Sequence, residues 1–290
     1  MSERAGVIAL AGAPNVGKST LLNRLVGRSL SIATAKPQTT RTRVLGVVTH
    51  GPAQLVFTDT PGIHSPRTAL HERMVGSARV ETRRADLACW LLAADRGWTA
   101  VDRRELAALA GRPTVIVVNK VDLVAHERVL PIIAAAAEVV PDGEFFPLSA
   151  RTGEGVDALL EHLAARMPSG PWLYPADSLT DQPTRFFVAE LVREQLFRQL
   201  DKELPYRVAV KVEQYEERKP KTYIEAVIFA DADSVKKIIV GKEGSRIKAI
   251  GKAARKSIET FLGTPIFLQL HVRVRKDWQS DRRFLKELGL

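Results

Sequence analysis

The chain lacks the features that stabilise small secreted proteins and anchor membrane proteins. Its 290 residues include one cysteine, so no internal disulfide can form, and the apolar run DLACWLLAAD around Cys89 predicts a buried core position. No apolar run approaches the roughly 20 residues that a membrane-spanning helix needs, and the N-terminus has no basic stretch followed by an apolar one. The six histidines also lack metal-site spacing, because His64 and His71 have no third ligand near them. We therefore expect a cytoplasmic protein.

Positive charge is what the chain has in excess, and it is unevenly distributed. The formal net charge is +10, and residues 185–290 contribute 23 basic and 15 acidic side chains to it. A basic surface favours a polyanionic partner, although charge says nothing about the fold. The sequence therefore places the partner-binding charge in the C-terminal third.

Apolar patterns predict an α/β domain in the first part of the chain. Val7–Gly12 is typical of a buried strand, and STLLNRLVG predicts a helix that ends at Gly27. The turn His50-Gly51-Pro52 between two apolar runs predicts a hairpin, and DLACWLLAAD and PTVIVVNK predict central parallel strands. The expected fold is a doubly wound, mostly parallel sheet with one antiparallel strand.

A proline-rich stretch, MPSGPWLYPADSLTDQP, predicts a linker before a second domain. After it, the helix FFVAELVREQLFRQLDKEL precedes two alternating strands, two helices broken at Gly241–Gly244, and a closing strand IFLQLHVRVRK. This order, α-β-β-α-α-β, predicts an α+β unit. The predicted boundaries are 1–168 for the first domain, 169–184 for the linker and 185–290 for the second domain.

The first chemical motif is GAPNVGKS, which fits G-x-x-x-x-G-K-[ST] between a predicted strand and a predicted helix. Backbone N–H groups of such a loop surround phosphates, the lysine reaches the β- and γ-oxygens, and the serine ligates Mg²⁺. A glycine turn beside a surface lysine is the alternative interpretation of this motif alone. The candidate phosphate-binding residues are Gly12, Asn15, Val16, Gly17, Lys18, Ser19 and Thr20.

Three further motifs follow in chain order: DTPG, NKVD and SAR. The Asp59 carboxylate could hold the metal through water, and the Gly62 N–H could meet the γ-phosphate. NKVD follows the apolar run VIVV, at the carboxyl end of a strand, where open α/β sheets bind ligands. The other candidate nucleotide-binding residues are Asn119, Lys120, Asp122, Ser149 and Ala150.

Asp122 predicts the choice of base. Guanine offers two donors to a carboxylate, whereas adenine would leave this acceptor unpaired, at a cost of about 1–3 kcal/mol or more. We therefore expect GTP to be preferred to ATP.

The polar stretch from Arg28 to Arg43 lies where GTPases keep their first switch. Thr40 is the candidate for the threonine that senses Mg²⁺ and the γ-phosphate, with Thr39 as the alternative, and an ordinary solvated loop also fits the stretch. The predicted metal ligands are Ser19, Thr40 and Asp59, and the predicted catalytic residues are Lys18, Thr40 and Gly62. Ile63 stands where a glutamine would orient the attacking water, so we expect slow hydrolysis without a partner.

A second glycine loop, IVGKEGS, lies between the two predicted helices of the C-terminal unit. A G-x-x-G loop in such a unit matches the KH arrangement, which clamps the backbone of about four nucleotides. A solvated basic helix with a glycine joint is the alternative, and Glu243 opposes phosphate binding. The candidate RNA-binding residues are Gly241, Lys242, Glu243, Gly244, Arg246, Ile247, Lys248 and Lys252. Trp278 could stack a base or anchor the packing.

These motifs together resemble the Era family of bacterial GTPases, from GAPNVGKS through QTTR, DTPG, NKVD and SAR to VGKEG and VRVRKDW. The resemblance implies a Ras-like P-loop GTPase domain followed by a type II KH domain. It also implies binding of the 3′ end of small-subunit ribosomal RNA, a role in maturation of the small ribosomal subunit, and peripheral association with the inner face of the membrane. We expect a monomer. The alternative is an RNA-binding assembly factor whose nucleotide site is mainly structural.

Overall fold

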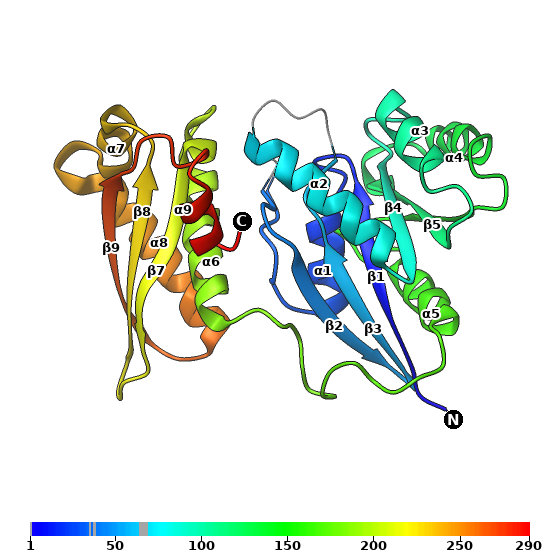
Figure 1. The fold of residues 1–290 in the computed structure, drawn as a ribbon, viewed down its shortest axis with the longest axis horizontal. Helices are drawn as coiled ribbons and strands as arrows, with labels where there is room; N and C mark the ends of the chain where they lie inside the picture. The colour runs from blue at the N-terminus through cyan, green and yellow to red at the C-terminus, as the bar shows by residue number, and fades with distance from the viewer. Residues whose placement is uncertain (1, 35, 37–38, 64–68) are drawn as a thin grey trace. The chain divides into compact units, whose positions relative to one another are not determined.

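The computed structural model describes residues 2–34, 36, 39–63 and 69–290. Clustering of contacts divides the chain into two compact units, Met1–Asp181 and Gln182–Leu290, each with a sheet of its own (Figure 1). His64 and residues 35, 37 and 38 of the predicted switch loop lie outside the described residues. In the ranges that are described, no helix is long and apolar enough to cross a bilayer.

The first unit is a three-layer α/β fold. Its described strands form a six-stranded sheet in the order β2-β3-β1-β4-β5-β6. Helices α2, α3 and α4 share one apolar cluster with strands β4 and β5, whereas α1 and α5 lie on the other face (Figure 1). Its elements are β1 (Arg4–Gly12), α1 (Lys18–Val26), β2 (Val44–His50), β3 (Ala53–Asp59), α2 (Ala69–Arg84), β4 (Leu87–Ala93), α3 (Ala100–Ala107), β5 (Thr114–Asn119), α4 (Val129–Ala137), β6 (Glu144–Leu148) and α5 (Val156–Arg166).

The local predictions for this unit are confirmed. β2 pairs antiparallel with β3 across the predicted hairpin, while the other strand pairs of the sheet are parallel. α1 ends at Gly27, whose φ of 72° is easily adopted only by glycine. Cys89 is completely buried in β4, and burial raises the pKa of its thiol to about 12.

The second unit has the predicted order α-β-β-α-α-β. Its described strands form a three-stranded sheet, β7-β8-β9, with β9 at one edge and parallel to β8. Alternate strand residues pack with α6, α7 and α8 into one core. On the opposite face, Phe284 of the short helix α9 packs edge-to-face against Phe229 of β8. Its elements are α6 (Thr184–Gln199), β7 (Val208–Glu216), β8 (Thr222–Ala230), α7 (Asp233–Val240), α8 (Ser245–Leu262), β9 (Ile266–Val274) and α9 (Arg282–Glu287).

Trp278 is a packing anchor in this unit, as one of its two interpretations predicted. Its side chain is fully buried, and Nε1 donates a hydrogen bond to the carbonyl oxygen of Arg207 at 3.3 Å. A buried indole whose N–H group is paired cannot stack on a nucleic-acid base.

Residues 169–181, which we call the strap, run along the edge of the first sheet. Gln54 Oε1 accepts hydrogen bonds from the backbone N–H groups of Leu173 and Tyr174, both at 2.9 Å. The Val47 N–H donates to the Leu179 carbonyl oxygen at 2.9 Å. The segment predicted as a linker is therefore hydrogen-bonded to β2 and β3 at Leu173, Tyr174 and Leu179.

Candidate functional sites

The loop between β1 and α1 encloses the side chain of Lys18. Gly12, Asn15 and Gly17 have φ angles of 142°, 62° and 100°, which curl the backbone around this side chain. Lys18 Nζ donates to the carbonyl oxygens of Gly12 at 3.1 Å and Ala13 at 2.9 Å. Burial lowers the pKa of Lys18 to about 8. A buried cation held by neutral carbonyls gains strongly from an incoming anion.

Two glycines of the site are required by close approach. A Cβ on Gly17 would lie 2.1 Å from Asn119 Nδ2, and a Cβ on Gly62 would lie 2.8 Å from both N and Cα of Pro14. The DTPG segment therefore packs directly on the phosphate loop. Any side chain at Gly62 would force these two segments apart.

Three hydroxyl groups converge on one carboxylate oxygen beside Lys18. The hydroxyls of Ser19, Ser31 and Thr40 donate to Asp59 Oδ2 at 2.7, 2.6 and 3.1 Å. Among the described residues, Asp59 Oδ1 is buried without a partner, and burial raises the pKa of this carboxyl. Hydroxyl and carboxylate oxygens are the ligands that Mg²⁺ prefers, so this oxygen-rich cluster fits a magnesium ion.

Thr40, rather than Thr39, reaches this cluster. Thr40 Oγ1 lies 3.0 Å from Ser19 Oγ, whereas Thr39 Oγ1 donates to the Ile32 carbonyl oxygen at 3.1 Å. Ser31 had not been predicted. It is placed by Asn23, whose Oδ1 accepts from the Ser31 N–H at 2.9 Å and whose Nδ2 donates to the Ser31 carbonyl oxygen at 2.8 Å.

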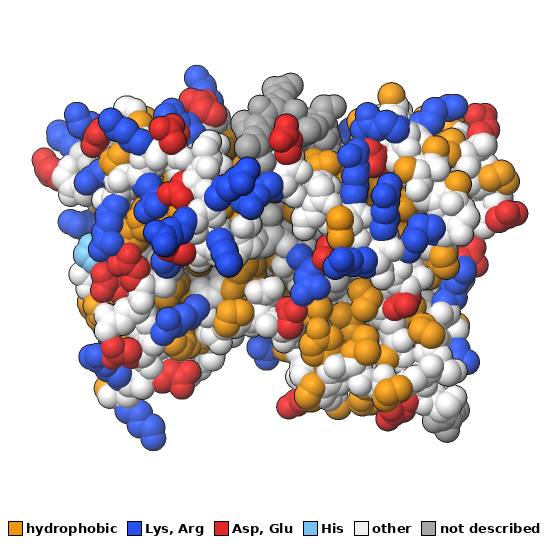
Figure 2. Space-filling view, viewed as in Figure 1, with side chains coloured by type: hydrophobic (Ala, Val, Ile, Leu, Met, Phe, Trp, Pro, Cys, Tyr) orange, Lys and Arg blue, Asp and Glu red, His pale blue; other side chains and the backbone are white. Residues whose placement is uncertain are grey.

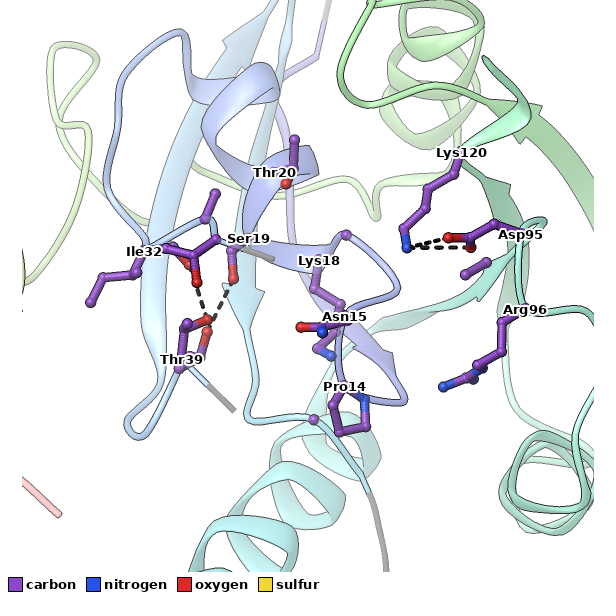
Figure 3. A pocket seen from close by; sticks show the side chains of 16 residues that line it. Pro14, Asn15, Lys18, Ser19, Thr20, Ile32, Thr39, Asp95, Arg96 and Lys120 are labelled. Atoms are coloured by element: carbon purple, nitrogen blue, oxygen red, sulfur yellow. Dashed lines mark hydrogen bonds and ion pairs between the residues drawn. The ribbon is translucent and has the colours of Figure 1, made fainter. Parts of the chain in front are cut away.

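A cavity of about 590 Å³ opens over this loop. Figure 3 shows Lys18 and Ser19 at the start of α1 on one side, and Lys120 paired with Asp95 on the other, with Nζ to Oδ2 at 3.0 Å. Asp95 and Arg96 line the cavity although no motif indicated them. The predicted residues that line it are Asn15, Gly17, Lys18, Ser19, Thr20, Thr40, Gly62 and Lys120.

The residues predicted to bind the base lie outside this cavity but close to one another. Asn119 Oδ1 accepts from the Ala150 N–H at 2.9 Å, and Arg151 Nη2 donates to Asp122 Oδ2 at 2.5 Å. A hydrogen bond from Ser149 and the Arg151 guanidinium hold the pKa of Asp122 below its usual value. Because the Arg151 side chain is 71% exposed, an incoming base can displace it at little cost.

Ile63 faces away from the cavity. Its side chain is 2% exposed and belongs to the apolar cluster under α2, with Trp90. Its backbone N–H donates to the Gly12 carbonyl oxygen at 3.0 Å. The position after DTPG thus has neither the amide nor the direction needed to orient a water molecule.

The second glycine loop joins α7 to α8, as predicted. Gly241 has a φ of 72°, and a Cβ there would lie 2.9 Å from the Arg246 Cβ. Gly244, with a φ of 77°, is the N-cap of α8, and Glu243 between them has a φ of 52°. The loop therefore turns tightly and leads directly into the N-terminus of the 18-residue helix α8. The unpaired N–H groups and the dipole at a helix N-terminus favour the binding of anions.

The basic residues around this loop are mostly on the surface. Lys242, Lys248 and Lys252 are exposed, Arg246 Nη1 donates to the Ile238 carbonyl oxygen at 3.1 Å, and Ile247 packs on the core. Lys and Arg side chains are also spread over the face of this unit seen in Figure 2. The structure thus brings the predicted RNA-binding residues together on one loop and helix.

The first unit combines a phosphate loop and a guanine-type base motif on a doubly wound sheet. The second unit has the order α-β-β-α-α-β and a G-x-x-G loop. Together these features define a GTPase that carries a KH domain. Residues 7–120 match the family described as 50S ribosome-binding GTPase, and residues 203–279 match the KH domain. The chain is 46% identical over 290 residues to GTPase Era of Geobacter metallireducens, covering 99% of this chain and 97% of that one. It is 47% identical to GTPase Era of Sinorhizobium medicae, covering 99% and 94%.

Two solved structures agree with these relatives. A point variant of Aquifex aeolicus Era bound to GDP and AlF4⁻ has a TM-score of 0.93 and 36% identity, with 99% of both chains covered. Era in complex with MgGDPNP and nucleotides 1506–1542 of 16S ribosomal RNA has a TM-score of 0.94, also at 36% identity and 99% coverage of both chains. The chain belongs to the GTPase Era family.

Proposed function

We propose that this GTPase is a nucleotide-controlled RNA-binding switch of small-subunit ribosome assembly. The observation that carries the proposal is the convergence of Ser19 and Thr40 on Asp59, because it joins the phosphate loop, the first switch and DTPG in one cluster. A segment that reaches the metal and the γ-phosphate through one threonine is released when that phosphate leaves. The cluster is thus the part of the site that can distinguish GTP from GDP.

We assign the phosphate end of GTP to the 590 Å³ cavity. Lys18 binds the β- and γ-phosphates, and the Gly62 N–H donates to the γ-phosphate. Ser19 and Thr40 would ligate Mg²⁺ directly and Asp59 through water. Bound there, Mg²⁺ supplies positive charge to the phosphate oxygens. Asn119 and Asp122 bind guanine, supported by the backbone of Ser149 and Ala150.

Hydrolysis by the protein alone is proposed to be slow. The support is the burial of Ile63, which leaves the attacking water without a side-chain amide to orient it. A protein or RNA partner, or backbone groups of the site, must then position the water. A single-turnover rate in the isolated protein close to that of partner-stimulated GTPases would contradict this.

The RNA partner is proposed to be the 3′ end of small-subunit ribosomal RNA. The support is the relative whose structure contains nucleotides 1506–1542 of 16S ribosomal RNA, together with the intact loop Gly241–Gly244 of this chain. Lys242, Arg246, Lys248 and Lys252 offset the charge of Glu243 at this loop. Three further proposals are a cytoplasmic location, from the composition, peripheral contact with the inner face of the membrane, from the family resemblance, and a monomeric state.

Binding to a single-stranded RNA with the small-subunit 3′-terminal sequence tests the switch. Affinity is measured with GDP and with a non-hydrolysable GTP analogue, at one salt concentration because phosphate contacts make affinity salt-dependent. We expect tighter binding in the GTP form, and by linkage the RNA must strengthen GTP binding by the same factor. Lys18→Ala is expected to abolish GTP turnover and to leave the second unit folded.

The second candidate function is an RNA-binding assembly factor whose nucleotide site is structural. The tight packing of Gly62 on Pro14 is compatible with this function. Both residues line the phosphate cavity, so a bound nucleotide would fill the cavity and support the contact. Equal RNA affinities in both nucleotide states would favour this second candidate.

A further inference from the structure

The face of the second sheet opposite the helices carries an exposed aromatic pair. Tyr223 on β8 and Phe267 on β9 are direct partners in the parallel register. Their rings are stacked, with centroids 5.5 Å apart and planes at 10°. The Phe267 side chain is 53% exposed, an unusual position for a phenylalanine at the edge of a sheet.

The ring of Tyr223 is held in a fixed orientation. Its hydroxyl donates to Gln269 Oε1 at 3.0 Å, and the guanidinium carbon of Arg218 lies 5.5 Å from its ring centroid. The pair therefore presents a rigid, flat apolar surface whose outer ring is Phe267. We call this surface the aromatic platform.

The turn between β7 and β8, beside the platform, carries an excess of positive charge, which favours an anion. Glu216 pairs with Arg218 and Glu213 with Arg273, so these two carboxylates are neutralised locally. Glu225 lies 3.3 Å from the His271 ring and has no arginine or lysine partner among the described residues. Lys219 and Lys221, in the turn between β7 and β8, are exposed, and Lys221 also interacts electrostatically with the Glu259 carboxylate. Glu217 is the one nearby carboxylate of this turn that opposes them.

We propose that the aromatic platform stacks a base of single-stranded RNA whose neighbouring nucleotides are held at the Gly241–Gly244 loop. Aromatic rings beside basic residues are the usual means of holding single strands, because every base has a flat face. The proposal rests on the RNA binding proposed above and adds a second contact to it. The base is read by shape and not by its hydrogen-bonding edge, so the contact is tolerant of sequence.

The position of the platform sets the length of RNA that it can hold. The glycine loop precedes α8 and Phe267 follows it, and an 18-residue helix spans about 27 Å. Figure 1 shows the start of β9 at the end of this unit away from α7. A KH loop holds about four nucleotides, so only a longer strand, passing round the edge strand β9, reaches both contacts.

The test measures the affinity of the full chain and of three Phe267 variants for two RNAs. The salt concentration and the bound guanine nucleotide are the same throughout. The probes are single-stranded RNAs of 3′-terminal small-subunit sequence with about 6 and about 20 nucleotides, chosen from the reach of the KH loop. Phe267→Ala is expected to weaken binding of the longer RNA about tenfold and to leave the shorter one unchanged. Phe267→Trp should keep full affinity because it keeps an aromatic ring. Phe267→Leu should weaken binding as much as Phe267→Ala, because leucine keeps the apolar bulk but has no ring to stack on.

Two controls separate the possible failures. Lys242→Ala at the glycine loop should weaken both RNAs, and Leu130→Ala, which removes another exposed apolar side chain, should change neither. If the loop variant has no effect, the proposed RNA site itself fails. If the loop variant acts as expected but Phe267→Ala binds the longer RNA normally, the platform is overturned. Base stacking would also be overturned if Phe267→Ala weakened the binding of both RNAs equally, or if Phe267→Leu bound the longer RNA with normal affinity. The exposed sheet face would then be a candidate site for a protein partner.

Discussion

The side-chain amide of Asn119 donates a hydrogen bond to the carbonyl oxygen of Val16 at 2.7 Å, although the two residues are 103 positions apart. The same side chain accepts from the Ala150 N–H at 2.9 Å. One asparagine thus ties the phosphate loop to the loop that follows β6. The residue assigned to the base is also the residue that holds the two loops together.

Replacing Asn119 by alanine should destabilise the first unit even without nucleotide. The substitution leaves the Val16 carbonyl and the Ala150 N–H without their partner, and a buried unpaired group costs about 1–3 kcal/mol. Urea unfolding followed by tryptophan fluorescence measures the loss. Gln199→Ala at the end of α6, where the side chain is only half-buried, serves as a control with little expected effect. Equal stability of Asn119→Ala and wild type would contradict the structural part of its role.

Gly62→Ala should impair the response to the γ-phosphate more than nucleotide binding itself. The added Cβ would meet Pro14 at 2.8 Å and move DTPG away from the phosphate loop. We expect GDP affinity to change by less than about threefold and single-turnover GTP hydrolysis to fall by more than about tenfold, a difference of 1.4 kcal/mol or more in the barrier. Gly76→Ala in α2, where a Cβ meets nothing within 4 Å, is the matched control and should retain activity. A normal rate for Gly62→Ala would refute the close-packing argument.

The preference for guanine should not depend on pH between 5 and 8. The pKa of Asp122 lies below the usual 3.8, so the group is a carboxylate throughout this range and loses its charge only as the pH falls through the lowered value. The ratio of affinities for GDP and inosine diphosphate, which lacks the exocyclic amine, isolates this contact because phosphate ionisation cancels. The ratio should stay constant in titrations at pH 5, 6, 7 and 8. A steady decline between pH 7 and 5 would show that Asp122 titrates in that range.

Ile63→Gln should not restore rapid hydrolysis. The side chain at this position points into the apolar cluster under α2, so a glutamine would bury its amide among apolar groups and not reach the nucleotide. We expect a loss of about 1–3 kcal/mol in unfolding free energy, with no gain in single-turnover rate. Ile63→Val is the control, with a smaller loss in stability. A rate increase of tenfold or more in the glutamine variant would mean that the side chain swings toward the γ-phosphate.

The sequence predicts most of the fold because its signals are local. The hairpin at Gly51, the helix end at Gly27 and the break at Gly241–Gly244 each follow from turn chemistry or periodicity within a few residues. The clustering of motif residues follows from topology, since the carboxyl ends of neighbouring parallel strands meet at one edge of the sheet.

The features that the sequence does not predict depend on contacts between distant segments. Ser31 reaches Asp59 only because Asn23 fixes the backbone of its loop, and no motif marks either residue. Likewise, the proline-rich segment predicts a linker from composition. Its hydrogen bonds to Gln54 become visible only when β3 is in place, 119 residues away in the chain.

The strap leaves only a short length of chain between the two units. Asp181 at its end is bonded to Arg43 at 2.9 Å, so only Gln182 and Pro183 separate this anchored point from α6. Three Cα–Cα steps lead from Asp181 to Thr184 and span at most about 11 Å, and one of the two residues between them is a proline with a fixed φ. The Arg43–Asp181 pair therefore joins the end of the strap to a point three residues after Thr40, the threonine of the metal cluster.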